Sequence, residues 1–394
     1  MQKLYSNLIS AKGLAVFSGL LFLLNFLSKF LKEICSVRIP VYPSTVLKFL
    51  AVALLLIYFV MYLKTKKFAR YIYILILLFG IDLIIKSFQE ISFDILYSRS
   101  YYFFKGIFLF LFFIAIKDLD KKDLEKPIKI LFFIGKLNLL LILIGAAFDI
   151  NLFQSYPHTD RFGYNGIMAE PGISSYFYIL LTSIAYVRYR YQNDTYWTTI
   201  FMLIATAFLG TKSGYLYIGI LIFIHLLYIL KKTAYQISFV AVLLTTAILL
   251  KDKLIQIAIN SFNFGTYLYE KHGLITFITS KRDLLLEDTI GYISENWTVV
   301  QYMIGGMDFR KHRVEFEFID VFLFFGLIGF FVYIIALKKM FLSTKQKVLY
   351  VLFLLTVLLI SSLSGNLFFS ITNSFCFVLV FIYLNKSLTV TKSA

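Results

Sequence analysis

The sequence predicts an all-α, polytopic integral membrane protein, and three observations lead to that prediction. Hydrophobic residues make up 60% of the 394-residue chain and aromatic residues 19%, and the mean hydropathy is +0.80. A soluble domain is about 45–50% apolar, so this chain has more apolar surface than a soluble core can bury. The apolar residues also form continuous runs rather than the alternation that a membrane β-barrel requires.

Twelve apolar runs approach the length of about 20 residues that a membrane helix needs. They lie near residues 14–31, 45–63, 71–89, 101–117, 128–148, 172–188, 196–210, 214–230, 236–250, 317–337, 347–363 and 367–385. We therefore predict about twelve transmembrane helices in one integral membrane domain, residues 1–394. The run 196–210 is short, so it could instead be a half-helix or a re-entrant element.

The distribution of Lys and Arg in the short loops predicts which side of the membrane each loop faces. Alternate connections and both termini are basic, which places them in the cytoplasm. The residues are Lys3, Lys12, Lys64, Lys66, Lys67, Arg70, Lys117, Lys121, Lys122, Lys126, Lys129, Arg188, Arg190, Lys231, Lys232, Lys338, Lys339, Lys345, Lys347, Lys386 and Lys392. The formal charge of +17 is thus largely a topology signal, and no nucleic-acid partner is predicted.

The opposite side receives the loop 149–171 and one large periplasmic loop, residues 251–316. Long translocated segments escape the charge rule, so the cations of this loop can lie outside. They are Lys251, Lys253, Lys271, Lys281, Arg282, Arg310, Lys311 and Arg313. They indicate either an anionic ligand or a solubilising surface. Within the loop, Asp283–Val300 could form one or two short amphipathic helices on the bilayer surface.

The first polar element at this side is the stretch Arg161–Tyr178, RFGYNGIMAEPGISSYFY. It carries Arg161 and Glu170 at the mouth of an apolar helix. Ionisable residues at such a position suggest a functional site. The alternative is an ordinary interfacial loop in which Gly and Pro make turns and Arg161 touches lipid headgroups.

Two further elements carry a cation each. In the turn Gly210–Gly214, glycines on both sides of Lys212 would let a ligand approach closely, although the turn could be a simple hairpin. In Thr279–Asp283, Arg282 could hold a phosphate with two hydrogen bonds, although it could equally be a solvated surface arginine.

The fourth element is the approach to the tenth apolar run, Gly305–Asp320, which contains His312, Glu317 and Asp320. Glu317 and Asp320 are three residues apart and share one helical face. Carboxylates that enter a membrane are costly unless they line a wet cavity, so we expect Asp320 to face one. A helix-capping role is the alternative for Glu317.

Metal and nucleotide chemistry have no signature in this sequence. Two cysteines and four scattered histidines give no recurring zinc-ligand spacing. Phosphate-binding glycine motifs and a nucleophile elbow are lacking as well. We therefore predict no metal and no cofactor.

Taken in order, these elements resemble the bacterial O-antigen polymerase family (Wzy-type), which is related to the O-antigen ligases. The shared pattern is R-x-G followed by E-P at a helix start, a T-x-S-G turn and an S-x-R-D element. It ends with G-G, a histidine and E-x-E-x-x-D-x-x-x-x-x-G-x-x-G. The resemblance covers roughly residues 155–335. One departure is that the T-x-S turn carries an arginine in many relatives, where this chain has Lys212.

The resemblance implies a GT-C-like, metal-independent glycosyltransferase of the bacterial inner membrane that works in lipopolysaccharide biosynthesis. It would join oligosaccharide repeat units carried on undecaprenyl diphosphate at the periplasmic face. Arg161, Lys212 and Arg282 match the family's basic positions and would contact the diphosphate. Glu170, His312, Glu317 and Asp320 are candidates for the catalytic base or for positioning the acceptor. Membrane lipid and a chain-length regulator protein are further partners that the resemblance suggests.

Other functions fit part of the sequence. An O-antigen ligase also carries a histidine before its last motif, so His312 does not separate a ligase from a polymerase. A flippase for lipid-linked oligosaccharides, or another secondary transporter, could have the same size and helix number. Transporters usually have short loops and charges near the membrane midplane, whereas the polar residues here gather at helix mouths on one side.

Overall fold

The computed structural model describes residues 7–36, 41–63, 68–87, 92–157, 159, 161–260, 265–342 and 346–389. Within those ranges the chain is helical, and its β-structure is one isolated bridge between Gln154 and Tyr164. Some basic residues used for the topology prediction lie outside the described residues. They are Lys3, Lys64, Lys66, Lys67, Lys345 and Lys392.

The helices follow one another with short connections. Their bounds are α2 Ala11–Glu33, α3 Pro43–Tyr58, α4 Ala69–Ser87, α5 Phe93–Ile116, α6 Lys121–Phe148, α7 Pro171–Tyr191, α8 Tyr196–Phe208, α9 Lys212–Ile229, α10 Thr233–Leu249, α11 Lys251–Asn260, α12 Gly265–Thr279, α13 Arg282–Asn296, α14 Val299–Ile304, α15 Glu317–Phe341, α16 Val348–Ser364 and α17 Ile371–Thr389. A π-helical turn, η1 Phe59–Leu63, follows α3, and a 3-10 turn, η2 Asn151–Phe153, follows α6.

Every one of the twelve apolar runs coincides with a helix of the described structure. Seven of these helices are long and apolar enough to cross a membrane, namely α2, α3 with the start of η1, α5, α6, α9, α15 and α17. The chain is therefore a helical membrane protein, while the count of twelve crossings stays a prediction. Helix α4 carries a buried ionisable residue, Asp82, whose carboxylate pairs with Arg99 of α5 at 2.5 Å.

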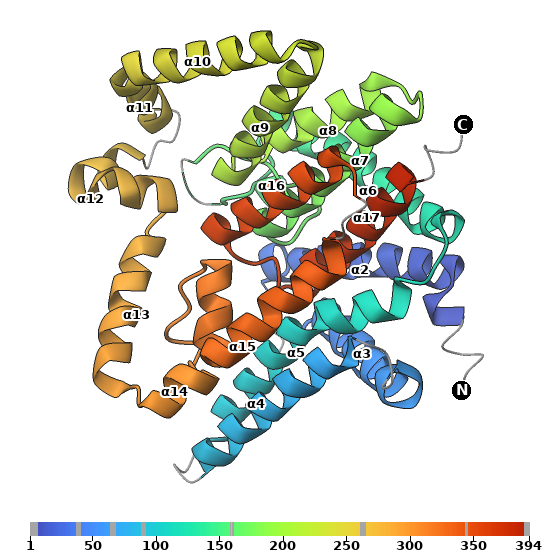
Figure 1. Cartoon of the computed structure of the whole chain (residues 1–394), viewed down its shortest axis with the longest axis vertical. Helices are drawn as coiled ribbons and strands as arrows, with labels where there is room; N and C mark the ends of the chain where they lie inside the picture. Colours follow the sequence, from blue (N-terminus) through green and yellow to red (C-terminus); the bar gives the residue numbers. More distant parts are fainter. Residues whose placement is uncertain are drawn as a thin grey trace.

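Helix α17 lies at the centre of the helical bundle (Figure 1) and packs against α5, α6 and α7. Nearly all of its side chains are buried, including Phe375, Phe377 and Phe381. Helix α2 packs along α6, and α15 packs along α4 and α16. An apolar helix surrounded by other helices in this way is shielded from lipid, so its position rests on side-chain packing.

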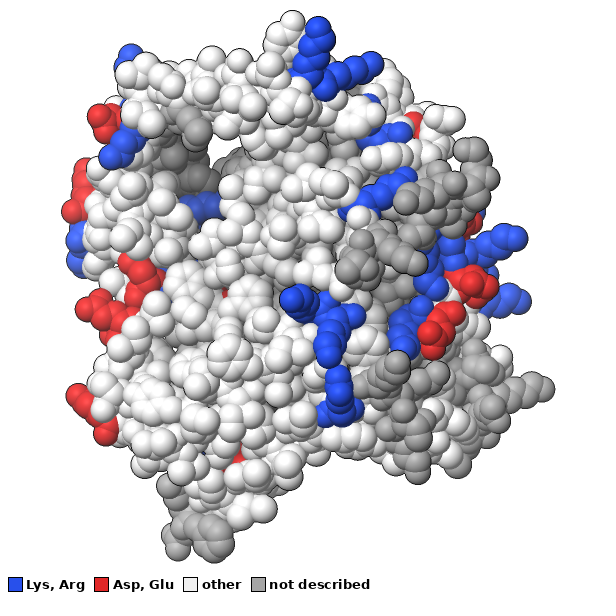
Figure 2. All heavy atoms as spheres, in the orientation of Figure 1, with Lys and Arg blue, Asp and Glu red and all other residues white. Residues whose placement is uncertain are grey.

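The two ends of the bundle differ in what they carry. Both chain termini lie on the right in Figure 1, whereas α11–α14 lie on the left. Figure 2 shows Lys and Arg side chains mainly over the right half of this face, with a broad uncharged surface between its edges. The predicted large loop, 251–316, is mostly helical in its described part. Helix α13 confirms a short helix within Asp283–Val300, while α14 begins only at Val299, and a position on the bilayer surface stays a prediction.

Helix α15 is interrupted at Gly326, whose φ is 68°. A Cβ atom there would lie 2.3 Å from the backbone nitrogen of Gly305, so the two glycines permit a direct backbone contact. This contact seats the segment that precedes α15 against the middle of that helix. It thereby fixes where residues 306–316 turn back over the start of α15.

Candidate functional site

A cavity of about 700 Å³ lies where the loops before α7 and α9 meet α12, α13 and the end of α16. Four of the seven predicted site residues line it, namely Arg161, Glu170, Lys212 and Arg282. They come from three separate parts of the sequence. We call this space the cationic cavity; the hollow beside α12 in Figure 2 has a basic side chain in its wall.

Arg161 and Lys212 are brought together by two glycines. A Cβ on Gly210, whose φ is 66°, would lie 1.9 Å from the carbonyl oxygen of Phe162, and one on Gly163 would lie 2.4 Å from the carbonyl oxygen of Leu209. The two turns therefore pack backbone against backbone, as only glycine allows. The Arg161 guanidinium donates to the Gly210 carbonyl oxygen at 3.3 Å across this contact.

Lys212 is the first residue of α9 and points from the helix start toward α12. The preceding Thr211 caps the helix, since its hydroxyl accepts the Gly214 N–H at 3.2 Å. The Lys212 ammonium donates to the Phe277 carbonyl oxygen and to the Ser280 hydroxyl, the latter at 3.2 Å. The Thr211 cap thus fixes the start of α9, from which the Lys212 side chain extends toward α12.

Arg282 enters the cavity from the start of α13. The neighbouring Asp283 accepts hydrogen bonds from Thr276 and Thr279; these bonds outweigh desolvation and lower the pKa of Asp283. The Arg282 guanidinium donates to Thr279 O and to Glu315, both at 3.1 Å. Its Nε is buried and has no hydrogen-bond partner among the described residues.

The three cations lie close enough to repel one another. Burial lowers the pKa of Arg161 from its ordinary value, and the charge of Arg282 acts in the same direction. Both arginines also repel the Lys212 ammonium. Like charges gathered in a partly dry cavity are unfavourable in isolation, so the arrangement suits a bound anion.

Glu170 is the carboxylate of the cationic cavity. It is the N-cap residue of α7, but its side chain makes no capping bond, and the residue is exposed to the cavity. Within the described ranges its carboxylate makes no hydrogen bond and no ion pair. A carboxylate that lines a cavity without a fixed partner is available to a ligand hydroxyl.

The loop that holds Arg161 and Glu170 is anchored by buried polar residues that sequence reasoning did not find. Lys29 of α2 donates to Asn165 Oδ1 at 2.7 Å and to the Gly166 carbonyl oxygen at 2.9 Å. Asn138 of α6 accepts the Ile167 N–H at 2.7 Å. Both lie within apolar runs, and their partners are distant in the sequence, so neither contact could be predicted from the sequence.

Glu317 does not line the cationic cavity. Its side chain is fully buried, and its carboxylate accepts three successive backbone N–H groups, residues 367–369, at 2.7, 2.5 and 3.2 Å. It therefore fixes the turn between α16 and α17. That turn carries Asn366, which lines the cavity. Glu317 therefore holds part of the cavity wall in place without lining the cavity itself.

The expectation that Asp320 faces a wet cavity is wrong. The residue is 0% exposed, and its carboxylate accepts the Val314 N–H at 3.1 Å and pairs with Arg313 Nε at 3.4 Å. Burial alone would lower the pKa of Arg313, but the Asp320 and Glu317 carboxylates outweigh it and the net shift is upward. Partners supplied by the 313–316 turn, rather than water, compensate the buried charge.

His312 also lies away from the cationic cavity. Its ring stacks on Tyr292 of α13, with the ring centroids 4.1 Å apart. The contact joins the 305–316 segment to α13. The histidine thus packs against the outer side of this region.

Aromatic and small polar residues complete the cavity wall, and the sequence did not single them out. The Tyr156 ring lies under the Arg161 guanidinium, 3.8 Å from centroid to Cζ. Tyr176 donates its hydroxyl to the Gly365 carbonyl oxygen at 2.8 Å. Ser364 and Asn366 lie on the same wall. Tyrosine faces and small hydroxyl or amide groups are the surfaces on which sugar rings commonly stack and hydrogen-bond.

No family model, curated protein or solved structure matches this chain. The site must therefore be judged by its own chemistry. Among the described residues, no three His, Cys, Asp or Glu side chains gather where they could hold a metal ion.

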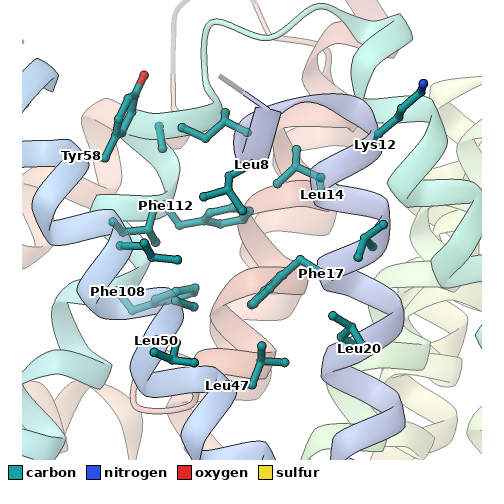
Figure 3. Close-up of a pocket in the computed structure, with 17 residues that line it drawn as sticks. Leu8, Lys12, Leu14, Phe17, Leu20, Leu47, Leu50, Tyr58, Phe108 and Phe112 are labelled. Atoms are coloured by element: carbon teal, nitrogen blue, oxygen red, sulfur yellow. The ribbon is translucent and has the colours of Figure 1, made fainter. Parts of the chain in front are cut away.

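A second cavity, of about 420 Å³, has a very different lining (Figure 3). It lies between α2, α3 and α5 and is almost entirely apolar. Lys12 and Tyr58 lie toward one end in Figure 3, and Leu20, Leu47 and Leu50 toward the other. Because it lacks converging polar groups, it offers nothing for chemistry, and the cationic cavity is the candidate active site.

Proposed function

We propose that the chain is a polysaccharide polymerase of the O-antigen type, a glycosyltransferase that uses lipid-diphosphate-linked donors. One observation carries the proposal: three cations distant in sequence line one cavity together with a carboxylate that has no fixed partner. The cations suit a diphosphate leaving group, and Glu170 suits an acceptor hydroxyl. The resemblance to Wzy-type polymerases names the same four residues in these two roles.

The proposed reaction needs one bond formed and one broken. The acceptor sugar hydroxyl oxygen attacks the anomeric carbon of the donor, and its proton passes to the Glu170 carboxylate. The bond between that carbon and the diphosphate oxygen breaks, and the diphosphate leaves with the electron pair. Arg161, Lys212 and Arg282 stabilise the negative charge that develops on the leaving group.

The two buried acids, Glu317 and Asp320, have supporting roles in this proposal. Glu317 holds the turn that carries Asn366, and Asp320 holds Arg313. His312 supports the packing between α13 and the 305–316 segment. Glu170 is thus the proposed base, because it alone of the predicted acids lines the cavity.

The proposed setting is the bacterial inner membrane, with twelve crossings, both termini in the cytoplasm and the cationic cavity open to the periplasm. Two features support it. The basic connections alternate along the chain, as the positive-inside rule requires for this orientation. The helical segment 251–316 also lies at the end of the bundle away from the termini (Figure 1).

The deciding experiment measures the ladder of polysaccharide chain lengths in cells that depend on this protein. Each lost cation contact should reduce the rate by about 10²–10³-fold, equivalent to about 2.7–4 kcal/mol of transition-state stabilisation. Arg161→Ala and Arg282→Ala should therefore leave single, unpolymerised repeat units on the outer lipid core. Lys212→Arg should be tolerated, since it keeps the charge and restores the residue common among relatives, whereas Lys212→Ala should not.

Protein abundance serves as the control. Long chains from an abundant Arg161→Ala, Arg282→Ala double variant would overturn the shared diphosphate site. Loss of all surface sugar, including the single repeat, would point instead to a ligase or a flippase.

A further inference from the structure

A second group of cations lies beside the cationic cavity and has no part in the reaction described above. Its members are Lys48 of α3, Lys105 of α5 and Arg313 of the segment before α15. The two lysines interrupt apolar helices, where a charge is costly without a compensating partner. Both residues are partly buried.

Aromatic rings hold this second group together. The Lys105 ammonium lies 3.9 Å from the ring centroid of Tyr101 and 5.0 Å from that of Tyr102. The Arg313 guanidinium lies 5.7 Å from the same Tyr102 ring. Lys48 donates to Asn25 Oδ1 at 3.0 Å, and its charge acts on Lys105. Cations from α3, α5 and the segment before α15 therefore lie near one another, around Tyr101 and Tyr102.

The two lysines are not neutralised by the protein. Arg313 is matched by the buried acids beneath it. By contrast, neither Lys48 nor Lys105 has a carboxylate within ion-pair distance among the described residues, and Lys105 has no hydrogen-bond acceptor there. The one carboxylate whose charge acts on both lysines is Glu170. The two lysines thus share a single acid, and a bound anion would stabilise their charged forms.

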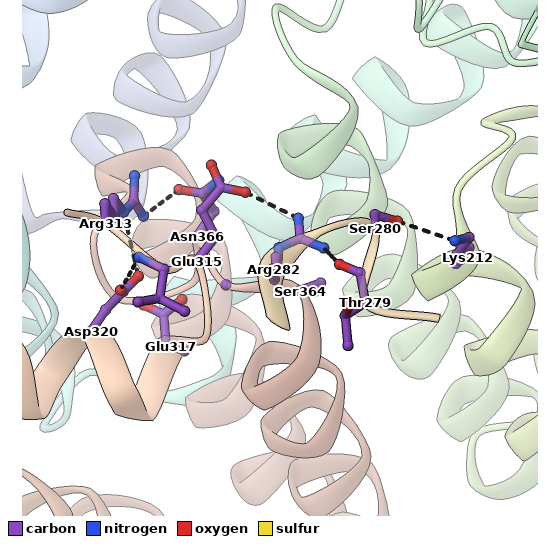
Figure 4. A network of polar contacts seen from close by, with 12 residues as sticks. Lys212, Thr279, Ser280, Arg282, Arg313, Glu315, Glu317, Asp320, Ser364 and Asn366 are labelled. Carbon is purple, nitrogen blue, oxygen red and sulfur yellow. Dashed lines mark hydrogen bonds and ion pairs between the residues drawn. The ribbon is translucent and has the colours of Figure 1, made fainter. Parts of the chain in front are cut away.

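The second group adjoins the first. Glu170 lines the cationic cavity and lies within electrostatic range of both lysines. Arg313 donates to Asn366 Oδ1 at 2.6 Å, and Asn366 lines the cavity too. Figure 4 shows the labelled side chains in a row, from Asp320 and Arg313 past Asn366, Glu315 and Arg282 to Ser280 and Lys212. Glu170 and Asn366 therefore lie between two basic clusters.

From this juxtaposition we infer that Lys48 and Lys105, with Arg313 at their edge, form a second diphosphate subsite that holds the acceptor's lipid carrier. The inference rests on the proposed function, in which both substrates carry a lipid diphosphate. Each substrate would then have its own cations, and Glu170 would lie between the two. Two compact ammonium groups on membrane helices suit an anionic headgroup whose chain stays in the bilayer.

The test measures how many lipid diphosphate molecules each variant binds. Native mass spectrometry of the purified full chain, titrated with undecaprenyl diphosphate, should detect two molecules bound to the wild type. The Lys48→Gln, Lys105→Gln double variant should bind one, and so should the Arg161→Ala, Arg282→Ala variant. Lys105→Arg should keep two, because it keeps the charge. Lys271→Gln, which removes an exposed lysine of α12, should also keep two.

A single carrier on the wild type that is lost with Arg161 and Arg282 would overturn the second subsite and leave the proposed function standing. A wild type that binds none would overturn both. A photoreactive carrier analogue on the unmodified protein gives a measurement that no folding defect can disturb. Crosslinks are expected in α3 and α5 as well as near α9, and their absence from α3 and α5 would contradict the inference.

Discussion

Two charged regions of this protein lie side by side but differ in how their charges are satisfied. In the cationic cavity, Arg282 keeps a buried donor without a partner and Glu170 makes no ion pair within the described structure. At the start of α15, Glu317 and Asp320 are fully buried and bonded to backbone N–H groups or to Arg313. Both regions looked functional in the sequence, because ionisable residues at a helix mouth do not reveal their partners. The carboxylate that lines the cavity has no partner among the described residues, whereas the two carboxylates at the start of α15 are fully bonded and hold the surrounding turns in place.

Glu170→Gln should reduce activity more than any other single substitution considered for these two regions. It keeps the shape and removes the proposed base, so polymer formation should fall by about 10²–10⁴-fold, the usual contribution of a general base. Its carboxylate has no described partner, so the free energy of unfolding should change by less than about 0.5 kcal/mol. Chain-length ladders and thermal unfolding in detergent measure the two effects. Normal polymer from Glu170→Gln would remove the distinction between the two regions.

Gly210→Ala should have the next largest effect, because the cationic cavity depends on close contact between two turns. An alanine would strain the backbone at φ 66° and collide with Phe162 O, destabilising the protein by about 1–3 kcal/mol. Arg161 and Lys212 would separate, and polymer formation should fall even in the folded fraction. Gly219→Ala is the matched control, since nothing lies within 4 Å of a Cβ at that position. Equal behaviour of the two variants would show that the glycine contact does not build the site.

Asp320→Asn tests the region at the start of α15. Of the three substitutions, it should have the smallest effect on activity. The amide oxygen can still accept the Val314 N–H, but the ion pair with Arg313 is lost, so the protein should lose about 1–3 kcal/mol of stability. Polymer made per folded molecule should fall far less than with Glu170→Gln. The measurement is the unfolding midpoint together with the ladder normalised to protein amount. A stable Asp320→Asn protein that makes no polymer would return Asp320 to the list of catalytic candidates.

The class of the protein and the positions of its helices could be predicted from the sequence alone. Each apolar run became a helix because, without water, a backbone satisfies its hydrogen bonds within the helix. The sequence also singled out Arg161 and Glu170 at a helix mouth, Lys212 in a turn and Arg282 in the large loop, and all four line the cationic cavity. The helix positions could be predicted because they depend on neighbours in the chain.

Which charged side chains line the same cavity could not be predicted from the sequence, because it depends on long-range contacts. Gly163 and Gly210 bring two turns into contact across 47 positions of sequence, and the Glu317 carboxylate meets backbone N–H groups 50 residues further along. Lys48 and Lys105 lie within apolar runs of the sequence, and the charge of Glu170 acts on both only because α3 and α5 pack near the loop before α7. The energy of a buried charge depends on the partners that folding supplies, and those partners come from other elements of the chain.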